Sequence, residues 1–361
     1  MRIALAVLAC LGLLLGAAAG IQTVRRRRLE RQRRVLLADV GVLQSALLPE
    51  LPERIGGARV TAAYRPAAGL AAGGDFYDAF KLPGGRTAVL VGDIAGHGRE
   101  VVPLTALVRY SLRAYLEAGL TPRAALHVAG HVLPAQLGGR QVTIAVAIFD
   151  PGTGRLTYAC AGHGPPLLQT TAEPVTVSSS PPIGTGAPTG RRQTTIALAP
   201  GASACFFTDG LDEIPVAGGR LGREGVAQEL QRVGPQGDAA DLLATIVQSS
   251  ERQPDDMAVC ILTALPGGAE HWSLRLEELE VDAAAMSGGW TKRFLLACGV
   301  AEPHIAKALR EADRIIGRAG TAIIEVRMGE TLTDVRVHRP PAVTMPIARR
   351  FANPMDLAAT G

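Results

Sequence analysis

Short apolar runs, rich in β-branched and aromatic residues, dominate the chain after residue 54. Runs of about four to eight such residues between Gly, Pro and Asp turns are typical of β-strands. The pattern predicts strands over Thr87–Val91, Val142–Phe149, Leu156–Cys160, Thr194–Leu198, Ala202–Thr208 and Ala258–Leu262.

Longer stretches with helical spacing of apolar residues separate these strands. The pattern predicts helices over Val101–Ala118, Pro122–Leu133, Gly225–Val233 and Ala239–Gln253. Thr121 offers an N-cap for the second helix, with proline at its first position. Many strands with a few helices inserted between them favour an α+β sandwich over a regular alternation of strands and helices.

The N-terminal end has a different pattern. Residues Ile3–Val24 carry no charge, and a helix of this length spans roughly 33 Å, enough to cross a bilayer core. Arg25–Arg28 follow at once, where they can contact anionic headgroups, and this asymmetry places the following chain in the cytoplasm. A cleaved signal peptide, with Ala17–Ala19 as cleavage site, is the alternative. We expect residues 1–24 to be a single transmembrane anchor in the cell membrane.

Residues 25–50 form a basic juxtamembrane and helical linker. A helix that ends before Pro49 is predicted by the leucines at positions Leu29, Leu36, Leu43 and Leu47. Two or three heptads are too few to assert a coiled coil. The helix therefore either joins two copies in a homodimer or packs as an amphipathic helix on its own chain.

Composition narrows the class of protein. Of 361 residues, 47% are hydrophobic and 19% charged, which excludes a disordered chain. The net charge is +4, yet residues 25–34 hold seven Arg and one Glu and so contribute +6 alone. The rest of the chain has a net charge of −2 and so offers no basic face for binding nucleic acid. The five cysteines form no CxxC pair, which indicates a reducing compartment.

Aspartates recur where predicted strands begin or end. They lie in Gly73–Asp78, which holds two carboxylates, and in Val91–Gly98, Phe206–Gly210 and Gln253–Met257. Each Asp-Gly alone is an ordinary turn signal, but turns do not require an apolar strand to run directly into Asp each time. Carboxylate and carbonyl oxygens suit Mg²⁺ or Mn²⁺, whereas zinc sites use His and Cys.

Six motifs follow one another along the chain: GGDFYD, GDIAGHG, LTYACAGHGPPLL, PPIG, FFTDGLDE and DDMAV. The segments LQSALLPELPE and YRPA precede them, and the whole stretch runs from about Leu43 to Leu265. In this order the chain resembles the metal-dependent serine/threonine phosphatases, in the SpoIIE/RsbU-type branch of the protein phosphatase 2C-like fold. The resemblance implies that residues 51–265 form an antiparallel β-sandwich flanked by helices. It also implies two Mn²⁺ or Mg²⁺ ions at one end of the sandwich.

The resemblance carries a set of metal ligands. It implies that Asp93 bridges both ions and that the Ile94 carbonyl joins one of them. Asp75 then serves the first ion, and Asp209 and Asp255 hold the second. Two nearby cations acidify a bridging water for attack on phosphorus, so no protein nucleophile is required.

Four further residues at matching motif positions are less clearly part of this chemistry. Asp256 matches a position that holds a second acid or Asn in the family. His97 is a candidate acid for protonating the leaving group, whereas His163 is expected to fix a loop by a hydrogen bond. Thr143 matches the family's threonine in a FAT-type strand, although the Phe is absent here.

The implied activity is hydrolysis of phosphoserine or phosphothreonine on an anti-sigma-factor antagonist of the STAS type. The alternative is a catalytically silent pseudophosphatase scaffold, against which the presence of all four ligand aspartates weighs. Gly73–Phe76 also echoes the GGDEF box of diguanylate cyclases. Phe at the fourth position argues against that class.

Gly267–Gly268 marks a boundary before a small α/β module, residues 266–340. Its pattern predicts a strand, two helices that include Pro303–Ala319, and a hairpin over Thr321–Val337. It faintly resembles an anti-sigma-factor-type, histidine-kinase-like ATPase domain. The helix lacks the expected Asn and no Gly-rich phosphate loop follows, so we expect a degenerate or docking module that binds no ATP. Residues 341–361 form a tail.

Overall fold

The computed structural model describes Arg25 and residues 48–67, 73–96, 98, 100–169, 180–216, 219–234, 237–250, 255–266, 275–329 and 333–340. The predicted anchor, the linker helix over Leu29–Leu47 and the C-terminal tail lie outside these described residues. In the part of the chain that the structure describes, no helix combines the length and apolar character needed to cross a membrane.

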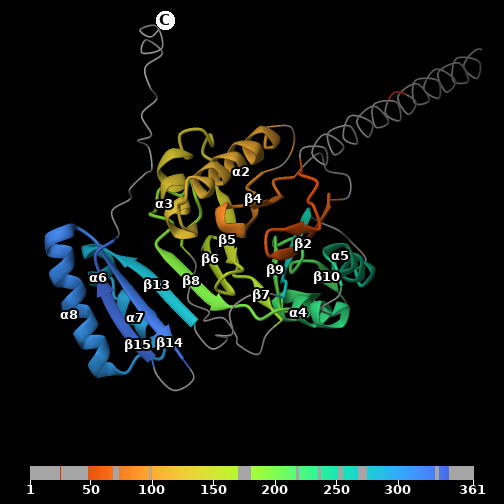
Figure 1. Ribbon diagram of the computed structural model, residues 1–361. Coiled ribbons are helices and arrows are strands. Elements are labelled where there is room, and N and C mark those ends of the chain that lie inside the picture. The colour runs from red at the N-terminus through yellow and green to blue at the C-terminus, as the bar shows by residue number, and fades with distance from the viewer. Residues whose placement is uncertain are drawn as a thin grey trace, which may run out of the picture.

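Two antiparallel sheets form the centre of the fold (Figure 1). The larger has the order β15-β14-β13-β8-β6-β5-β4-β3, and the smaller β1-β2-β12-β9-β7. The larger sheet contains β3 (Phe76–Lys81), β4 (Thr87–Ile94), β5 (Val142–Asp150), β6 (Arg155–Ala161), β8 (Arg192–Ala197), β13 (Arg275–Val281), β14 (Ala322–Met328) and β15 (Thr333–His338). The smaller contains β1 (Arg54–Ile55), β2 (Ala58–Arg65), β7 (Leu167–Leu168), β9 (Ser203–Phe207) and β12 (Met257–Ala264). A separate short hairpin joins β10 (Pro215–Val216) to β11 (Gly219–Arg220).

Helices cover the outer faces of both sheets. The larger sheet is covered by α2 (Val102–Glu117) and α3 (Pro122–Val132), and the smaller sheet by α4 (Gly222–Val233) and α5 (Ala239–Gln248). The C-terminal part contains α6 (Ala283–Ser287), α7 (Trp290–Ala297) and α8 (Glu302–Ala319). A short 3-10 turn, η1, spans Pro83–Gly85. Thr121 caps α3 as predicted, accepting a hydrogen bond from the Ala124 N–H at 3.4 Å. The α+β prediction is confirmed.

The prediction that α5 continues to Gln253 is wrong. The helix stops at Gln248. The Ser249 N–H donates to the Ile246 carbonyl, three residues back, at 3.1 Å, and the Ser249 hydroxyl donates to the same carbonyl at 2.7 Å. α4 in turn begins at Gly222, three residues before the predicted start at Gly225.

The central strands are apolar on both faces, which explains their unbroken hydrophobic runs. Successive side chains of a strand point to opposite faces. In β12, Ala258, Cys260 and Leu262 pack between the two sheets. Met257, Val259 and Ile261 pack instead against α4 and α5. The fold is therefore a β-sandwich with a helical layer on each side.

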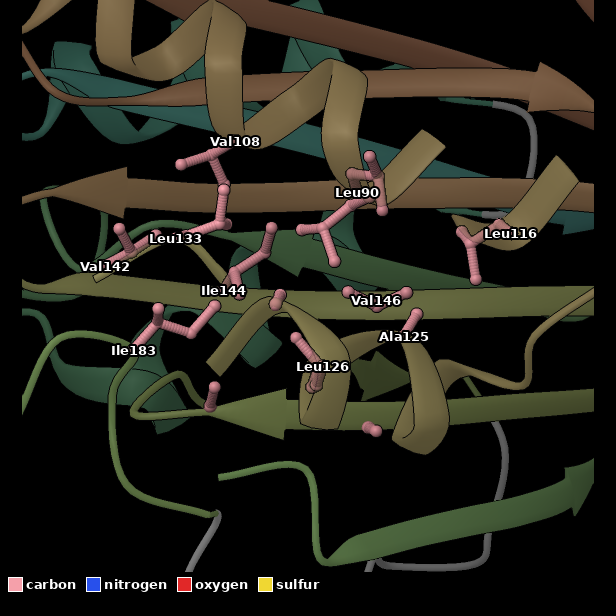
Figure 2. Close-up of a cluster of buried hydrophobic side chains, with 14 of the residues drawn as sticks. Leu90, Val108, Leu116, Ala125, Leu126, Leu133, Val142, Ile144, Val146 and Ile183 are labelled. Carbon is pink, nitrogen blue, oxygen red and sulfur yellow. The ribbon is translucent and has the colours of Figure 1, made fainter. Parts of the chain in front are cut away.

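Figure 2 shows the layer that joins the larger sheet to its helices. Leu90 and Ile144, from β4 and β5, point toward Val108 of α2 and Leu126 of α3, and all four side chains are completely buried. This packing fixes α2 on the sheet.

The C-terminal unit extends the larger sheet. Its first strand, β13, pairs antiparallel with β8 from Arg275↔Ile196 to Leu279↔Arg192. Its helices cover one face of β13–β15 around a separate apolar cluster that includes Phe294 and Ile305. The structure has α6, α7 and α8 between β13 and β14, where the sequence predicted two helices.

Charged side chains connect β13 to β8 through hydrogen bonds and ion pairs. Glu277 is completely buried. Its Oε2 accepts hydrogen bonds from Arg192 at 2.9 Å and Thr194 at 2.8 Å, and its Oε1 accepts one from Arg275 at 2.8 Å. Two ion pairs, Arg123–Glu280 and Arg191–Asp282, span the same junction.

Removing the Glu277 carboxylate should therefore destabilise the protein. Glu277→Ala leaves Arg192 in a buried position without its counter-ion, which typically costs about 3–5 kcal/mol of unfolding free energy. The control is Asp334→Ala, which breaks the exposed pair with Arg336 and should cost less than about 1 kcal/mol. Urea denaturation measures both. Equal losses in the two variants would contradict this account of the junction.

Candidate metal centre

Two aspartates meet at one end of the larger sheet. Asp93 lies near the end of β4, and Asp75 comes directly before β3. The two strands are antiparallel, with Phe76 opposite Gly92. This register brings Asp75 next to Asp93.

The smaller sheet delivers a second pair. Asp209 follows the end of β9, and Asp255 precedes the start of β12. These strands are antiparallel neighbours, with Phe207 opposite Val259. Their neighbouring ends therefore place Asp209 beside Asp255, and burial together with the charge of Asp255 raises the pKa of Asp209.

Thr208 joins the two pairs across the sandwich. Its side chain is completely buried. The hydroxyl donates to Asp75 Oδ2 at 2.5 Å and accepts from the Ala258 N–H at 2.9 Å. Thr208 is not among the site residues predicted from the sequence. The available signal was a threonine between the apolar end of β9 and Asp209.

A glycine allows the close approach of Asp93 and Ile94 to the β3 end. A Cβ on Gly74 would lie 2.0 Å from the Ile94 carbonyl oxygen and 2.3 Å from Asp93 Oδ1. The Gly74 carbonyl also accepts a hydrogen bond from the Ile94 N–H at 3.2 Å. Gly74 thus leaves space for the Ile94 carbonyl oxygen and for Asp93 Oδ1, and any side chain at this position would collide with both.

The carboxylates repel one another. Burial raises the pKa of Asp93 to about 7, and the charges of Asp209 and Asp255 add to the shift. Burial, followed by the charge of Asp93, raises the pKa of Asp75 well above its ordinary value. Because each acid disfavours the ionisation of its neighbours, the site favours a bound cation.

The donors fit hard divalent cations. Carboxylates and a backbone carbonyl are the oxygen ligands that Mg²⁺ and Mn²⁺ prefer. No three His, Cys, Asp or Glu side chains among the described residues are grouped to hold one ion alone. Mg²⁺ usually keeps several waters in its coordination shell, so protein atoms need not supply every ligand. The roles of Asp75, Asp93, Ile94, Asp209 and Asp255 as individual ligands stay predictions.

The second carboxylate of the GGDFYD motif does not join this centre. Asp78 is buried on the face of β3 that packs against α2. Its Oδ2 lies 3.6 Å from the guanidinium of Arg113 and 4.0 Å from that of Arg109. Asp78 therefore connects the sheet to α2.

Neither histidine of the motifs gains a role as an acid. His97 lies outside the described residues. His163 is buried, with Nδ1 at 3.5 Å from the Thr143 hydroxyl, and burial lowers its pKa to about 4. It is therefore neutral near pH 7. Thr143 stands opposite Asp93 in the β4–β5 pairing, so His163 supports a strand beside the carboxylates, in line with the predicted loop-fixing hydrogen bond.

Comparison with known proteins places this centre in a family. Residues 83–265, just over half of the chain, match the family described as Stage II sporulation protein E (SpoIIE). The chain belongs to the SpoIIE family. The resemblance stated from the sequence is confirmed.

Solved structures of similar fold agree with the family. The chain is similar to the RsbU and RsbW domains of Rv1364c from Mycobacterium tuberculosis, with 24% identity, a TM-score of 0.50 and coverage of 78% of this chain and 84% of that one. It is also similar to the SiaA-PP2C domain of Pseudomonas aeruginosa, with 22% identity, a TM-score of 0.52 and coverage of 66% and 98%. The SpoIIE-family chain thus shares the PP2C-like fold.

The repulsion at the centre predicts how stability depends on pH. A raised pKa means that the folded protein binds a proton more tightly than the unfolded chain does. In a chelating buffer, stability should fall as the pH rises from the ordinary aspartate value of 3.8 through about 7. Calorimetry should find a lower melting temperature at pH 8 than at pH 5.5, and Mn²⁺ should raise it most at pH 8.

Asp93→Asn is the matched variant, since it removes one charge and keeps the shape. With chelator at pH 8 it should melt above the wild type, and Mn²⁺ should stabilise it far less. A chelated wild type that is equally stable at both pH values would show that the carboxylates do not repel one another as described.

Proposed function

We propose that this protein is a metal-dependent phosphatase that hydrolyses phosphoserine or phosphothreonine on a regulatory protein. The observation that carries the proposal is the meeting of Asp75 and Asp93, from one sheet, with Asp209 and Asp255, from the other. The family match supports it, because the fold that holds these acids is PP2C-like.

Each residue of the centre has a distinct part in the proposal. Asp93 would contact both ions, with Asp75 and the Ile94 carbonyl on one side and Asp209 and Asp255 on the other. Two bound Mn²⁺ or Mg²⁺ ions would supply an acidified water as nucleophile and neutralise the phosphoryl oxygens. Thr208 holds the Asp75 carboxylate in place by its hydrogen bond. His163, with a pKa of about 4, carries no proton to donate near pH 7.

The proposed substrate is a phosphorylated STAS-type anti-sigma-factor antagonist or a similar phosphoprotein. The resemblance to the RsbU-type branch supports this choice, as does similarity to a structure that holds RsbU and RsbW domains. In this proposal the C-terminal unit acts through contact and binds no ATP. A pseudophosphatase scaffold is the competing function, and retention of all four aspartates favours the enzyme.

Hydrolysis should depend on added metal and on Asp93. We expect turnover of a phosphopeptide or an aryl phosphate with Mn²⁺ or Mg²⁺ and none with EDTA. Asp93→Asn should lower kcat/KM at least about 100-fold, because metal activation is worth several kcal/mol. Asp150→Asn is the control, since Asp150 lies at the other end of β5. Wild-type turnover by Asp93→Asn in metal-depleted buffer would contradict the two-metal mechanism, and an inactive wild type would favour the scaffold.

We also propose a location at the cell membrane. The uncharged run Ile3–Val24 followed by Arg25–Arg28 supports a single-pass anchor with the phosphatase in the cytoplasm. The leucine-spaced segment from Leu29 to Leu47 supports pairing of two copies beside the membrane. Both proposals rest on the sequence alone.

Cell fractionation tests the anchor. The full chain should sediment with membranes and resist carbonate extraction, whereas a chain that starts at Leu48 should stay in the supernatant. Protease added to spheroplasts should leave the phosphatase intact, because the bilayer separates the two. Digestion from outside, or a mature N-terminus near Gly20, would instead support a cleaved signal peptide and an exported body.

A further inference from the structure

Asp256 is a buried carboxylate that the proposed metal set leaves without a role. Only 3% of the residue is exposed. Its Oδ1 accepts a hydrogen bond of 2.6 Å from the backbone N–H of Ala67, a residue 189 positions earlier in the chain. Its Oδ2 is also buried, and the carboxyl interacts with the Tyr64 hydroxyl and the Gly73 backbone.

Gly73 covers the second oxygen of this carboxylate. A Cβ built on Gly73 would lie 1.1 Å from Asp256 Oδ2 and 2.2 Å from Asp256 Cγ. Gly73 is not among the glycines with positive φ, so its backbone would accept alanine. The constraint at this position is therefore the space that the Asp256 side chain occupies.

Ala67 and Gly73 belong to the same connection. It leaves β2 after Arg65 and enters β3 at Phe76, and it carries Asp75. Asp256 thus touches this connection at two points, by a hydrogen bond at Ala67 and by close packing at Gly73. It does so from just before β12, the strand that pairs with β2 in the smaller sheet.

We propose that Asp256 is a positioning residue that holds Ala67 and Gly73 in place so that Asp75 meets Asp93, and that it is not itself a metal ligand. One of its oxygens accepts a hydrogen bond from the Ala67 N–H and the other lies against Gly73, so both oxygens already contact this part of the backbone. The neighbouring Asp255 is the ligand candidate. The proposal rests on the proposed metal-dependent function of this centre.

A double-mutant cycle between Gly73 and Asp256 tests the packing. Gly73→Ala places a methyl group where the pinned carboxylate lies, so it should weaken Mn²⁺ binding by about tenfold or more and lower the melting temperature. In the Asp256→Ala background that space is open, and the same change should cost less than about threefold. Such coupling is expected of residues in contact. Calorimetry measures both quantities without any phosphorylated substrate.

Gly74→Ala is the matched control. Its methyl group would meet the Ile94 carbonyl oxygen at 2.0 Å, a backbone obstacle that Asp256→Ala cannot remove. Its cost should therefore be the same in both backgrounds. Should Asp256→Ala not fold, Asp256→Ser gives the same cycle, because serine ends short of the carboxylate oxygens.

Asp256→Asn separates a positioning residue from a ligand. Asparagine keeps a carbonyl oxygen that can accept the Ala67 N–H, so it should recover most of the Mn²⁺ affinity lost in Asp256→Ala. Loss as complete as in Asp93→Asn would make Asp256 a ligand and overturn the proposal. Equal cost of Gly73→Ala in both backgrounds would overturn it as well. Because neither readout uses hydrolysis, an inactive wild type would reject the proposed function and leave this test intact.

Discussion

Repulsion between buried carboxylates is the constraint on which this structure depends. Asp75, Asp93 and Asp209 all have raised pKa values because each is buried near other acids. Left to themselves, such groups would move apart into water. They stay together because each ends or begins a strand whose neighbours are packed on both faces. The apolar layers of the sandwich thus supply the stability that keeps these carboxylates together.

Strands packed on both faces also explain how much of the fold the sequence predicts. Their runs are apolar throughout, so β4, β5, β9 and β12 are visible without any knowledge of the partners. β2, which reads ARVTAAYR, is small and half-buried along much of its length, and its local pattern does not stand out. For β3 the sequence predicts the two aspartates of the GGDFYD motif and no strand, because Asp78 interrupts the apolar run.

The candidate site is predictable only where its parts are local. Aspartates at strand ends can be read from the chain, and antiparallel pairing brings them together. The hydrogen bond from Thr208 to Asp75 joins residues 133 positions apart, and no local pattern announces it. The same holds for Asp256, whose hydrogen-bond partner Ala67 lies 189 positions earlier in the chain. The sequence motifs identify the aspartates, whereas only the tertiary structure distinguishes those that face the candidate metal centre from those that support it.

The pairing of β13 with β8 changes where the larger sheet ends. An uncovered strand presents a row of free backbone groups that can pair with another chain and lead to aggregation. The C-terminal unit moves that edge from β8, whose Gln193, Thr194 and Thr195 are buried, out to β15. There the strand alternates Asp334, Arg336 and His338 with smaller apolar residues. Charges on a short outer strand discourage further pairing. The C-terminal unit therefore also gives the larger sheet a protected border.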